Sequence, residues 1–472
     1  MAFNSIAFAL FYLAFFPLYW SVNRRASKNA RNASVLLASY LFYGWWDWRF
    51  LGLIALSSAT DFWIGLAMGR QHNPGHKKML LLLSLAFNLG ILGFFKYYNF
   101  FAESLQDLLG LFGWQLDWPT LHIILPVGIS FYTFQTLSYT IDIYRGRLQP
   151  TRDPLSFFAF VAFFPQLVAG PIERAANLLP QFHARKAFQE SEVVGGLRLV
   201  VWGMFKKVVI ADNLGPIVDA LYAGPESYGA IGVFIGALLF SFQIYCDFSG
   251  YSDIAIGVAR TLGFRLSKNF ETPYLAGSFR EFWQRWHISL STWFRDYVYI
   301  PLGGSRVPPA RWKANTLITF VVSGLWHGAA FTFILWGFLH GFALLAERRS
   351  GREVRLPSWL LFLLVSLFWL PFRAEDLGQL GALAGQLGNP LAGWETCGQL
   401  LLELLSGTKV IWFGLVFAGF LWMEGRIDRS DFDRLIAAWQ KPLRRAVYYL
   451  LILCILLLGN FANAPQFIYF QF

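Results

Sequence analysis

Two histidines stand in a stretch that is otherwise apolar. The sequence SGLWHGAAFTFILWGFLHG, residues 323–341, holds His327 and His340 among aliphatic, aromatic and very small side chains. Ionisable groups inside a membrane segment are costly and normally face the protein interior or a water-filled cavity, so they are candidates for function. Gly324 and Gly328 flank His327 and allow another backbone or a substrate to come close. We take His327 as a candidate catalytic base, with an interhelical hydrogen bond as the structural alternative.

The spacing of these histidines argues against a metal site. His340 follows His327 by thirteen positions, which is not the i, i+4 spacing of a helical metal pair, and no HExxH pattern joins them. We expect His340 to serve packing. The three cysteines, Cys246, Cys397 and Cys454, have no short spacing and predict neither a disulfide framework nor a zinc site. No metal ion and no bound cofactor are expected.

A second candidate lies in FREFWQRWHISLSTWFRDYVYIPLGG, residues 279–304. Aromatic side chains recur there at three- and four-residue spacing, with charged residues between them. This pattern predicts a helix along an interface or against the protein core, starting at about Phe279, with His287 inside it beside Arg285 and Trp286. The structural alternative for His287 is an interfacial histidine on the polar face.

A third segment, residues 240–264, carries carboxylates in an apolar run. Asp247 and Asp253 stand there with Gln243, Ser249 and Tyr251, and no basic residue is close in sequence. A buried carboxylate needs a partner or water. The segment lacks the length and the closing Glu of a calcium loop, so Arg or Lys partners from the central part of the chain are expected.

Composition places these residues in a membrane protein. Of 472 residues, 56% are hydrophobic and 14% charged, and the mean hydropathy is +0.45. Soluble domains carry about 25% charged residues. The net charge of +11 falls in short clusters between apolar runs, which indicates cytoplasmic loops rather than nucleic-acid binding.

The charge pattern also predicts topology. The first apolar run precedes its positive charges, unlike a secretory signal, so we expect a retained first helix with the N-terminus outside. Basic stretches recur on every second crossing. Those expected in the cytoplasm are 22–32, 69–78, 144–152, 306–315, 347–355 and 423–434, whereas 45–50, 102–110 and 372–390 are expected outside, and a last span is expected at about 446–461.

The predicted fold class is an all-α polytopic membrane protein of about eleven to thirteen transmembrane and re-entrant helices. We expect one membrane domain, residues 1–472, because no soluble domain and no repeat is found. Its regions are regular helices in 1–153, a catalytic core in 154–347 and further helices in 348–472. Apolar runs between 154 and 305 look short and broken by Pro and Gly, as non-helical backbone around an internal site would require.

These pieces indicate acyl transfer. A histidine held neutral in a medium of low dielectric constant can act as general base toward a hydroxyl that attacks an acyl carbonyl. The chain has no GxSxG elbow and no Walker loop, and its cysteines lack a nearby histidine. Direct transfer between two substrates is therefore the simpler hypothesis, with a transient acetyl-imidazole as a second.

Several motifs together resemble one family over nearly the whole chain. QLVAGPIER (166–174), QIYCDFSGYSDIAIG (243–257), NFETPY (269–274), WHISLS, YIPLGG, GLWHGA and the terminal FIYFQF are similar to the membrane-bound O-acyltransferases, and most similar to their bacterial alginate O-acetylation branch. The resemblance implies a ring of helices around a thinned central site, with a cytosolic and a periplasmic funnel. It also implies that His327 and His287 are the family's two functional histidines. Our hypothesis is that His327 Nε2 activates the acceptor hydroxyl, with His287 orienting it or polarising the thioester carbonyl. The residues expected to contact substrate are Asn269, Arg285, Trp286, Asp296, Trp326, Gln243, Asp247, Ser249, Tyr251 and Asp253.

The same resemblance implies a biological setting. Acetyl would come from a cytoplasmic donor, with acetyl-CoA expected, and pass through the bacterial inner membrane. A periplasmic acetylase of the SGNH-hydrolase-like kind would then modify an exported polysaccharide, with alginate expected. Cellulose, another exopolysaccharide or peptidoglycan are alternative acceptors. Alternatives of another class are a transporter with proton-relaying histidines and a scaffold that performs no chemistry. We find no inverted repeat of the kind that many transporters show.

Overall fold

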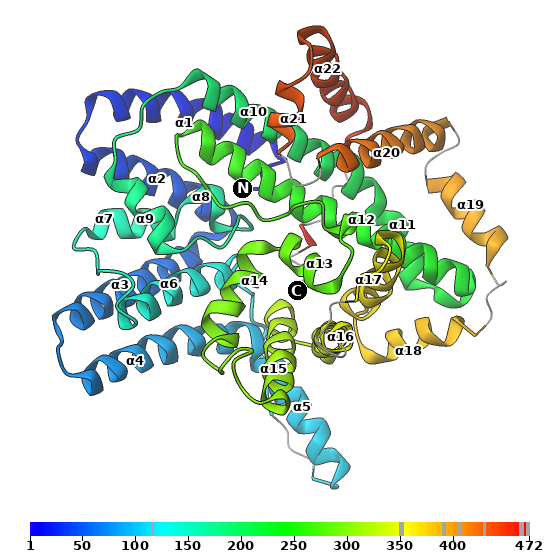
Figure 1. Ribbon diagram of the computed structural model, residues 1–472, viewed down its shortest axis with the longest axis horizontal. Helices are drawn as coiled ribbons and strands as arrows, with labels where there is room; N and C mark the ends of the chain where they lie inside the picture. Colours follow the sequence, from blue (N-terminus) through cyan, green and yellow to red (C-terminus); the bar gives the residue numbers. More distant parts are fainter. Residues whose placement is uncertain are drawn as a thin grey trace. The chain divides into compact units, whose positions relative to one another are not determined.

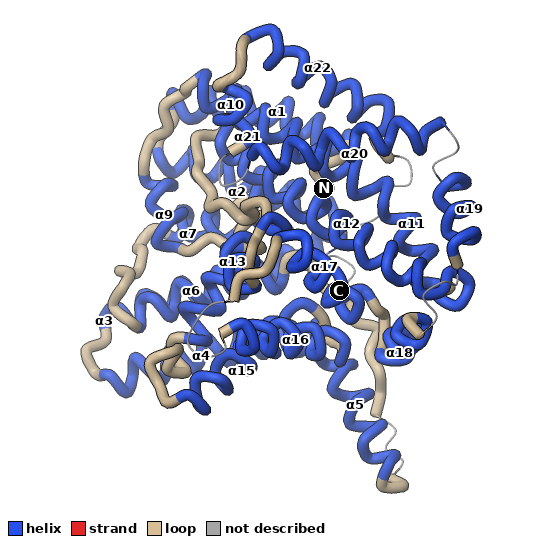
Figure 2. Tube along the Cα trace, turned by 45° about the vertical axis from the view of Figure 1, so that its right-hand side comes forward, coloured by secondary structure: helices blue, strands red, loops and turns tan. Residues whose placement is uncertain are grey.

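The computed structural model describes residues 1–114, 118–348, 354–388, 393–404, 408–427, 431–461 and 467–468. These residues form helices and connecting loops and no strand (Figures 1 and 2). Within the described ranges, five helical segments are long and apolar enough to cross a bilayer. They are Ile6–Arg25, Lys28–Arg70, Pro74–Leu111, Pro225–Thr261 and Val410–Ile427. The prediction of an all-α polytopic membrane protein is confirmed, while the count of eleven to thirteen segments stays a prediction.

Backbone contacts divide the chain into two compact units. Unit 1 comprises Met1–Gly196 and Val258–Ser267, and unit 2 comprises Leu197–Gly257 and Lys268–Phe472. The expected single domain with boundaries at 153 and 347 stays a prediction. Each unit is described by itself below.

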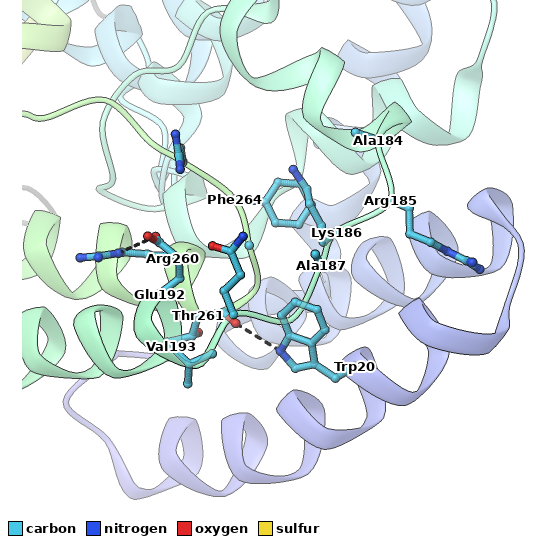
Figure 3. A pocket seen from close by; sticks show the side chains of 13 residues that line it. Trp20, Ala184, Arg185, Lys186, Ala187, Glu192, Val193, Arg260, Thr261 and Phe264 are labelled. Carbon is cyan, nitrogen blue, oxygen red and sulfur yellow. Dashed lines mark hydrogen bonds and ion pairs between the residues drawn. The ribbon is translucent and has the colours of Figure 1, made fainter.

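Unit 1 contains the helices that precede residue 197. They are α1 (Ile6–Arg25), α2 (Lys28–Asp47), η1 (Trp48–Phe50), α3 (Leu51–Arg70), α4 (Pro74–Leu92), η2 (Gly93–Tyr97), α5 (Tyr98–Leu111), α6 (Ile129–Tyr144), α7 (Pro154–Val161), α8 (Phe164–Leu167), α9 (Ala175–His183) and the start of α10 (Glu190–Met204). The end of α12 belongs to the same unit, and its Thr261 carbonyl accepts a hydrogen bond from Trp20 Nε1 of α1 at 3.2 Å (Figure 3).

The first basic stretch of unit 1 forms a much shorter loop than the sequence suggested. Residues 22–32 were expected to be a loop, yet only Ala26 and Ser27 separate α1 from α2. The Ser27 side chain accepts a hydrogen bond from the Ala30 backbone N–H at 3.3 Å and so caps α2. The basic residues therefore extend both helices, because a capped helix continues through polar positions as readily as through apolar ones.

Unit 2 contains the remainder of α10 and the helices that follow. They are η3, a π-helix (Phe205–Ala211), α11 (Asp212–Ala223), α12 (Pro225–Thr261), η4 (Pro273–Leu275), α13 (Phe279–Arg285), α14 (Ile288–Phe294), η5 (Arg295–Tyr299), α15 (Pro309–His327), α16 (Phe331–Glu347), α17 (Ser358–Arg373), α18 (Leu377–Gln386), α19 (Trp394–Leu404), α20 (Thr408–Ile427), α21 (Phe432–Ala437) and α22 (Lys441–Leu458). Parts of 347–355, 372–390 and 423–434, and residues 469–472 of the terminal motif, lie outside the described residues.

One element contradicts the expectation of short apolar runs between 154 and 305. The segment α12 has a kink at Gly229, where φ is 56° and ψ is −162°, and beyond it one continuous helix runs to Thr261. No proline follows Gly229 within the helix, so the polar positions at Asp247 and Asp253 are absorbed without a break. The other elements of this region are short, as expected.

Helices α15 and α16 form a close hairpin that depends on glycine. A Cβ atom on Gly324 would lie 2.1 Å from the Phe333 carbonyl oxygen, and one on Gly337 would lie 2.2 Å from the Phe320 carbonyl oxygen. Small residues allow such backbone approach between membrane helices. The hairpin fixes the end of α15, and therefore His327, against α16.

Candidate active site

His327 is the last residue of α15. This helix begins at Pro309 and ends because Gly328 has extended backbone (φ −155°, ψ 151°). A Cβ atom on Gly328 would lie 2.0 Å from the Phe333 ring, so glycine allows this ring to pack against the turn. His327 therefore lies at a helix end, where a side chain can face a site that a mid-helix position would not reach.

The His327 ring lies among aromatic rings. It is 3% exposed and contacts Trp326, Trp336 and Phe372 edge to face, with ring centroids 4.9, 5.1 and 5.3 Å away. Edge-to-face contacts of this kind fix the plane of the imidazole ring. The imidazole is thus held in a largely apolar surrounding.

His287 lies in a break between two short helices, not inside one helix as the sequence predicted. Helix α13 ends at Arg285 and α14 begins at Ile288, and His287 has left-handed backbone (φ 42°, ψ 54°). Such backbone is uncommon outside glycine. It costs on the order of 1–3 kcal/mol, and such residues concentrate at active sites. The His287 side chain is fully buried.

Asn269 stabilises the break by hydrogen bonds to His287 and Ser289. Its side-chain Oδ1 accepts hydrogen bonds from the Ser289 backbone N–H at 3.3 Å and the Ser289 hydroxyl at 2.9 Å, and it lies 3.1 Å from His287 Nδ1. A backbone N–H can only donate, so the Asn269 atom facing it is the oxygen. His287 Nδ1 must then carry a proton, which leaves Nε2 of the neutral ring as an acceptor.

The two catalytic candidates meet in unit 2. The ring centroids of His287 and His327 are 6.4 Å apart with an angle of 59° between the ring planes, and Trp326 contacts both rings. The two imidazoles are therefore neighbours in the interior of unit 2, with an indole ring against both of them.

His340 has different surroundings. It is fully buried, and the rings of Trp283, Trp336 and Phe368 lie 5.0, 5.0 and 5.2 Å from it. Neither of its ring nitrogens has a hydrogen-bond partner among the described residues. This enclosure agrees with the packing role expected from the sequence.

Comparison with known proteins decides the family. Residues 150–366 match the family described as MBOAT, membrane-bound O-acyltransferase. The chain is 38% identical to the probable alginate O-acetylase AlgI of Pseudomonas putida, with 100% of both chains covered. It is 43% identical to that of Azotobacter vinelandii over 80% of this chain and 76% of the relative. It is also 36% identical to the peptidoglycan O-acetyltransferase of Helicobacter pylori, over 82% and 80%.

The chain belongs to the membrane-bound O-acyltransferase family. It is an acyltransferase of the membrane, as the motifs suggested.

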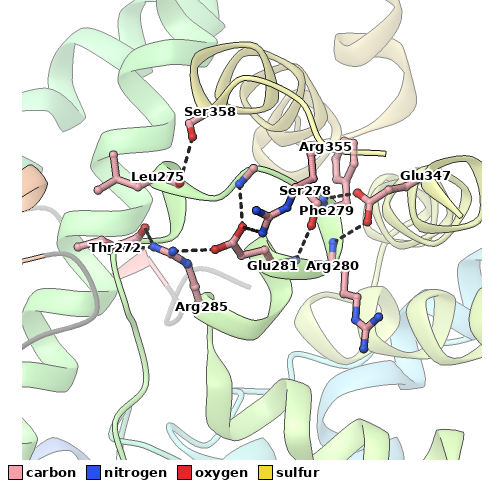
Figure 4. A network of polar contacts seen from close by, with 11 residues as sticks. Thr272, Leu275, Ser278, Phe279, Arg280, Glu281, Arg285, Glu347, Arg355 and Ser358 are labelled. Carbon is pink, nitrogen blue, oxygen red and sulfur yellow. Dashed lines mark hydrogen bonds and ion pairs between the residues drawn. The ribbon is translucent and has the colours of Figure 1, made fainter. Parts of the chain in front are cut away.

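Three residues predicted to contact substrate have structural contacts in this acyltransferase. The buried Arg285 guanidinium pairs with Glu281 Oε1 at 2.7 Å and donates to the Thr272 hydroxyl at 3.3 Å (Figure 4). Trp286 is 1% exposed and stacks on Phe282. Arg285 and Trp286 therefore fix the backbone immediately before His287. The Asp296 carboxylate pairs with Arg295 at 2.7 Å.

Glu281 is a residue that sequence reasoning left out. Besides Arg285, its Oε2 accepts a hydrogen bond from the Gly277 backbone N–H at 3.1 Å (Figure 4). The ion pair between Glu281 and Arg285 could have been predicted from the sequence, because the two residues are four positions apart and such pairs face each other on a helix.

The carboxylates of α12 have lysine partners, as predicted. Lys207 of the π-helix η3 pairs with Asp247 at 2.6 Å and with Asp212 at 2.7 Å. Lys206 pairs with Asp253 at 2.7 Å and donates to the Ser249 hydroxyl at 2.9 Å. These contacts bind α12 to η3, so the segment 247–253 carries an internal ion-pair cluster.

The remaining predicted contacts extend this cluster. Asp247 Oδ2 also accepts a hydrogen bond from the Ile468 backbone N–H at 2.8 Å. The Tyr251 ring packs on Phe467 with centroids 4.7 Å apart. Gln243 is 9% exposed, and its side-chain oxygen has no hydrogen-bond partner among the described residues. Of the residues predicted to bind substrate, the described structure places Asn269 and Trp326 in direct contact with the histidine pair.

Proposed function

We propose that this acyltransferase moves an acetyl group from a cytoplasmic donor, acetyl-CoA, through the inner membrane for O-acetylation of an exported polysaccharide, alginate. The observation that carries the proposal is the contact between two buried histidines in unit 2, one with its tautomer fixed by Asn269, in a chain of this family.

The proposed reaction uses His327 as general base. The oxygen of an acceptor hydroxyl attacks the thioester carbonyl carbon, a C–O bond forms and the C–S bond breaks. Nε2 of His327 takes the hydroxyl proton and returns it to the leaving thiolate, so the imidazole ends as it began. An apolar surrounding supports this role because it favours the neutral imidazole that can accept a proton.

His287 serves to orient the hydroxyl in this proposal. Two roles were predicted for it, and polarising the thioester carbonyl would require a proton on Nε2. Because Nδ1 donates a hydrogen bond to the Asn269 oxygen, the single proton of the neutral ring is on Nδ1 and Nε2 carries none. An Nε2 lone pair accepts a hydrogen bond from the attacking hydroxyl, so orientation is the role that the geometry supports.

Alginate is proposed as the acceptor on the strength of the relatives. The proteins of Azotobacter vinelandii and Pseudomonas putida carry that function in their names. The Helicobacter pylori relative, named a peptidoglycan O-acetyltransferase, supports peptidoglycan as the second candidate. In both cases a periplasmic acetylase of the SGNH-hydrolase-like kind would receive the acetyl group, and the basic turn between α1 and α2 would lie in the cytoplasm.

The test is acetyl transfer by proteoliposomes that hold acetyl-CoA labelled in its acetyl group inside. With a periplasmic acetylase outside, label should appear on added alginate and not on added peptidoglycan fragments. Label on peptidoglycan alone would show that peptidoglycan, and not alginate, is the acceptor. Acetyl-CoA that stays intact with either acceptor would contradict the proposal that it is the donor. Rapid quenching in denaturant at neutral pH, followed at once by mass spectrometry, tests for a labelled imidazole, because acetyl-imidazole keeps the label on the protein but hydrolyses in acid.

A further inference from the structure

Unit 1 contains a pocket apart from the histidines. It has about 680 Å³ of empty space, open mouth included, and lies where the end of α1, the residues after α9 and the end of α12 come together (Figure 3). Trp20 and Thr261 form part of its wall. Neither the proposed reaction nor the family motifs involve it.

The pocket wall has an excess of positive charge. Arg185, Lys186, Arg260 and Arg265 line it, with one carboxylate, Glu192. Arg260 Nε pairs with Glu192 at 2.8 Å (Figure 3). Among the described residues, no carboxylate pairs with the other three cations. Arg265 repels Lys186, and a bound anion would relieve that repulsion. The Arg185 guanidinium donates to the Ala26 carbonyl oxygen at 2.9 Å.

Lys186 contacts an aromatic ring of the pocket wall. Its ammonium lies 4.4 Å from the centre of the Phe264 ring (Figure 3), a cation–π contact. Burial lowers the pKa of Lys186 to about 8, and repulsion from Arg31 and Arg265 adds to the effect. Gly263 gives the lysine its path, because a Cβ there would lie 3.2 Å from Lys186 Cβ and the glycine φ is +78°.

We propose that this pocket binds a phosphate group, supplied by the headgroup of an anionic phospholipid. Arginine and lysine together suit phosphate oxygens, which accept several charge-assisted hydrogen bonds at once. The lipid source is favoured by position, because two apolar helices, Ile6–Arg25 and Pro225–Thr261, end at the pocket. Basic pockets at the ends of membrane helices bind anionic headgroups, and Trp20 is suited to the same interfacial depth.

A soluble phosphate ester would present the same chemistry, and experiment separates the two sources. Purified protein is exchanged into nanodiscs of phosphatidylcholine with or without phosphatidylglycerol, and retained lipid is measured by native mass spectrometry. Inorganic phosphate is titrated separately in phosphatidylcholine discs. Binding of phosphatidylglycerol that phosphate does not displace assigns the site to lipid. Binding of phosphate alone assigns it to a soluble ester.

The variants locate the site. Lys186→Gln with Arg265→Gln should weaken binding by roughly tenfold or more, since each basic residue near anionic headgroups contributes on the order of tenfold or somewhat less. Arg70→Gln with Lys78→Gln removes one arginine and one lysine outside the pocket and should leave binding unchanged. Lys186→Arg with Arg265→Lys keeps both positive charges and should retain binding. Equal binding by all variants, or none by the wild type, overturns the proposal.

Discussion

The side-chain oxygen of Asn269 lies 3.1 Å from Nδ1 of His287, and the same oxygen accepts the Ser289 backbone N–H at 3.3 Å. Asn269 also donates to the Ser252 hydroxyl of α12 at 3.2 Å, which anchors the amide from its other side. Because the amide is held at both ends, the imidazole cannot rotate freely and keeps its proton on Nδ1. Asn269 is thus a positioning residue for His287.

Replacing Asn269 with alanine should lower kcat about tenfold to a hundredfold with a smaller change in KM. The substitution frees the His287 ring to take the other tautomer, and correct protonation of a catalytic ring is worth factors of this order or more. The measurement is thioester cleavage over a range of pH, where Asn269→Ala should also change the pH profile.

Ser289→Ala is the matched control. It removes one hydrogen bond to the same Asn269 oxygen at 2.9 Å but leaves the contact with His287 in place. Kinetics close to those of the wild type are expected. A loss of equal size in both variants would mean that Asn269 supports the backbone turn and not the tautomer.

Lys207→Met should destabilise the protein strongly. It leaves the buried Asp212 and Asp247 carboxylates without their shared cation, and removing one partner of a buried ion pair typically costs about 3–5 kcal/mol. Thermal unfolding in detergent measures the effect. The exposed Lys441→Met of the same unit should change stability by about 0.5 kcal/mol or less.

Asp247→Asn separates a structural from a substrate-binding role. The amide of the variant keeps an oxygen that can accept the Ile468 N–H, and Lys207 keeps its ion pair with Asp212. We expect lower stability and an unchanged KM for the acetyl donor. A large rise in KM with unchanged stability would restore Asp247 to substrate binding, as the sequence had suggested.

Binding of the anionic headgroup to the unit 1 pocket should weaken as pH rises from 7 to 9. Lys186 loses its proton near pH 8, whereas a phosphodiester headgroup keeps one negative charge throughout. The charged groups that surround Lys186 are Arg31, Arg185, Arg260, Arg265 and Glu192. Lys186→Arg should remove the pH dependence, because arginine stays protonated. Binding by the wild type that does not change with pH would exclude Lys186 from the contact.

The sequence predicted what depends on local chemistry. The helical class follows from long apolar runs, and the lysine partners of Asp247 and Asp253 follow from the cost of burying a charge in any fold. The break at His287 could not be predicted in this way. Apolar spacing continues through residues 279–299 as if one helix ran there, and the contact that stabilises the break comes from Asn269, eighteen positions earlier.

The basic pocket of unit 1 could not be predicted from local sequence either. Its cations come from two stretches far apart in the chain, around Arg185 and around Arg265. Each stretch alone reads as an ordinary basic loop of a membrane protein. Only the fold of unit 1 brings them to one wall, where Glu192 is the one carboxylate among the described lining residues.

The most direct test compares three buried histidines in one assay. His327→Ala, His287→Ala and His340→Phe are purified, their folding is checked by thermal unfolding, and cleavage of labelled acetyl-CoA is measured in proteoliposomes. His340 has no hydrogen-bond partner among the described residues, so a ring of similar size should preserve activity. The account predicts folded His327→Ala with turnover reduced about 10²–10⁴-fold, a smaller loss for His287→Ala and none for His340→Phe. Turnover by folded His327→Ala equal to that of the wild type would contradict it.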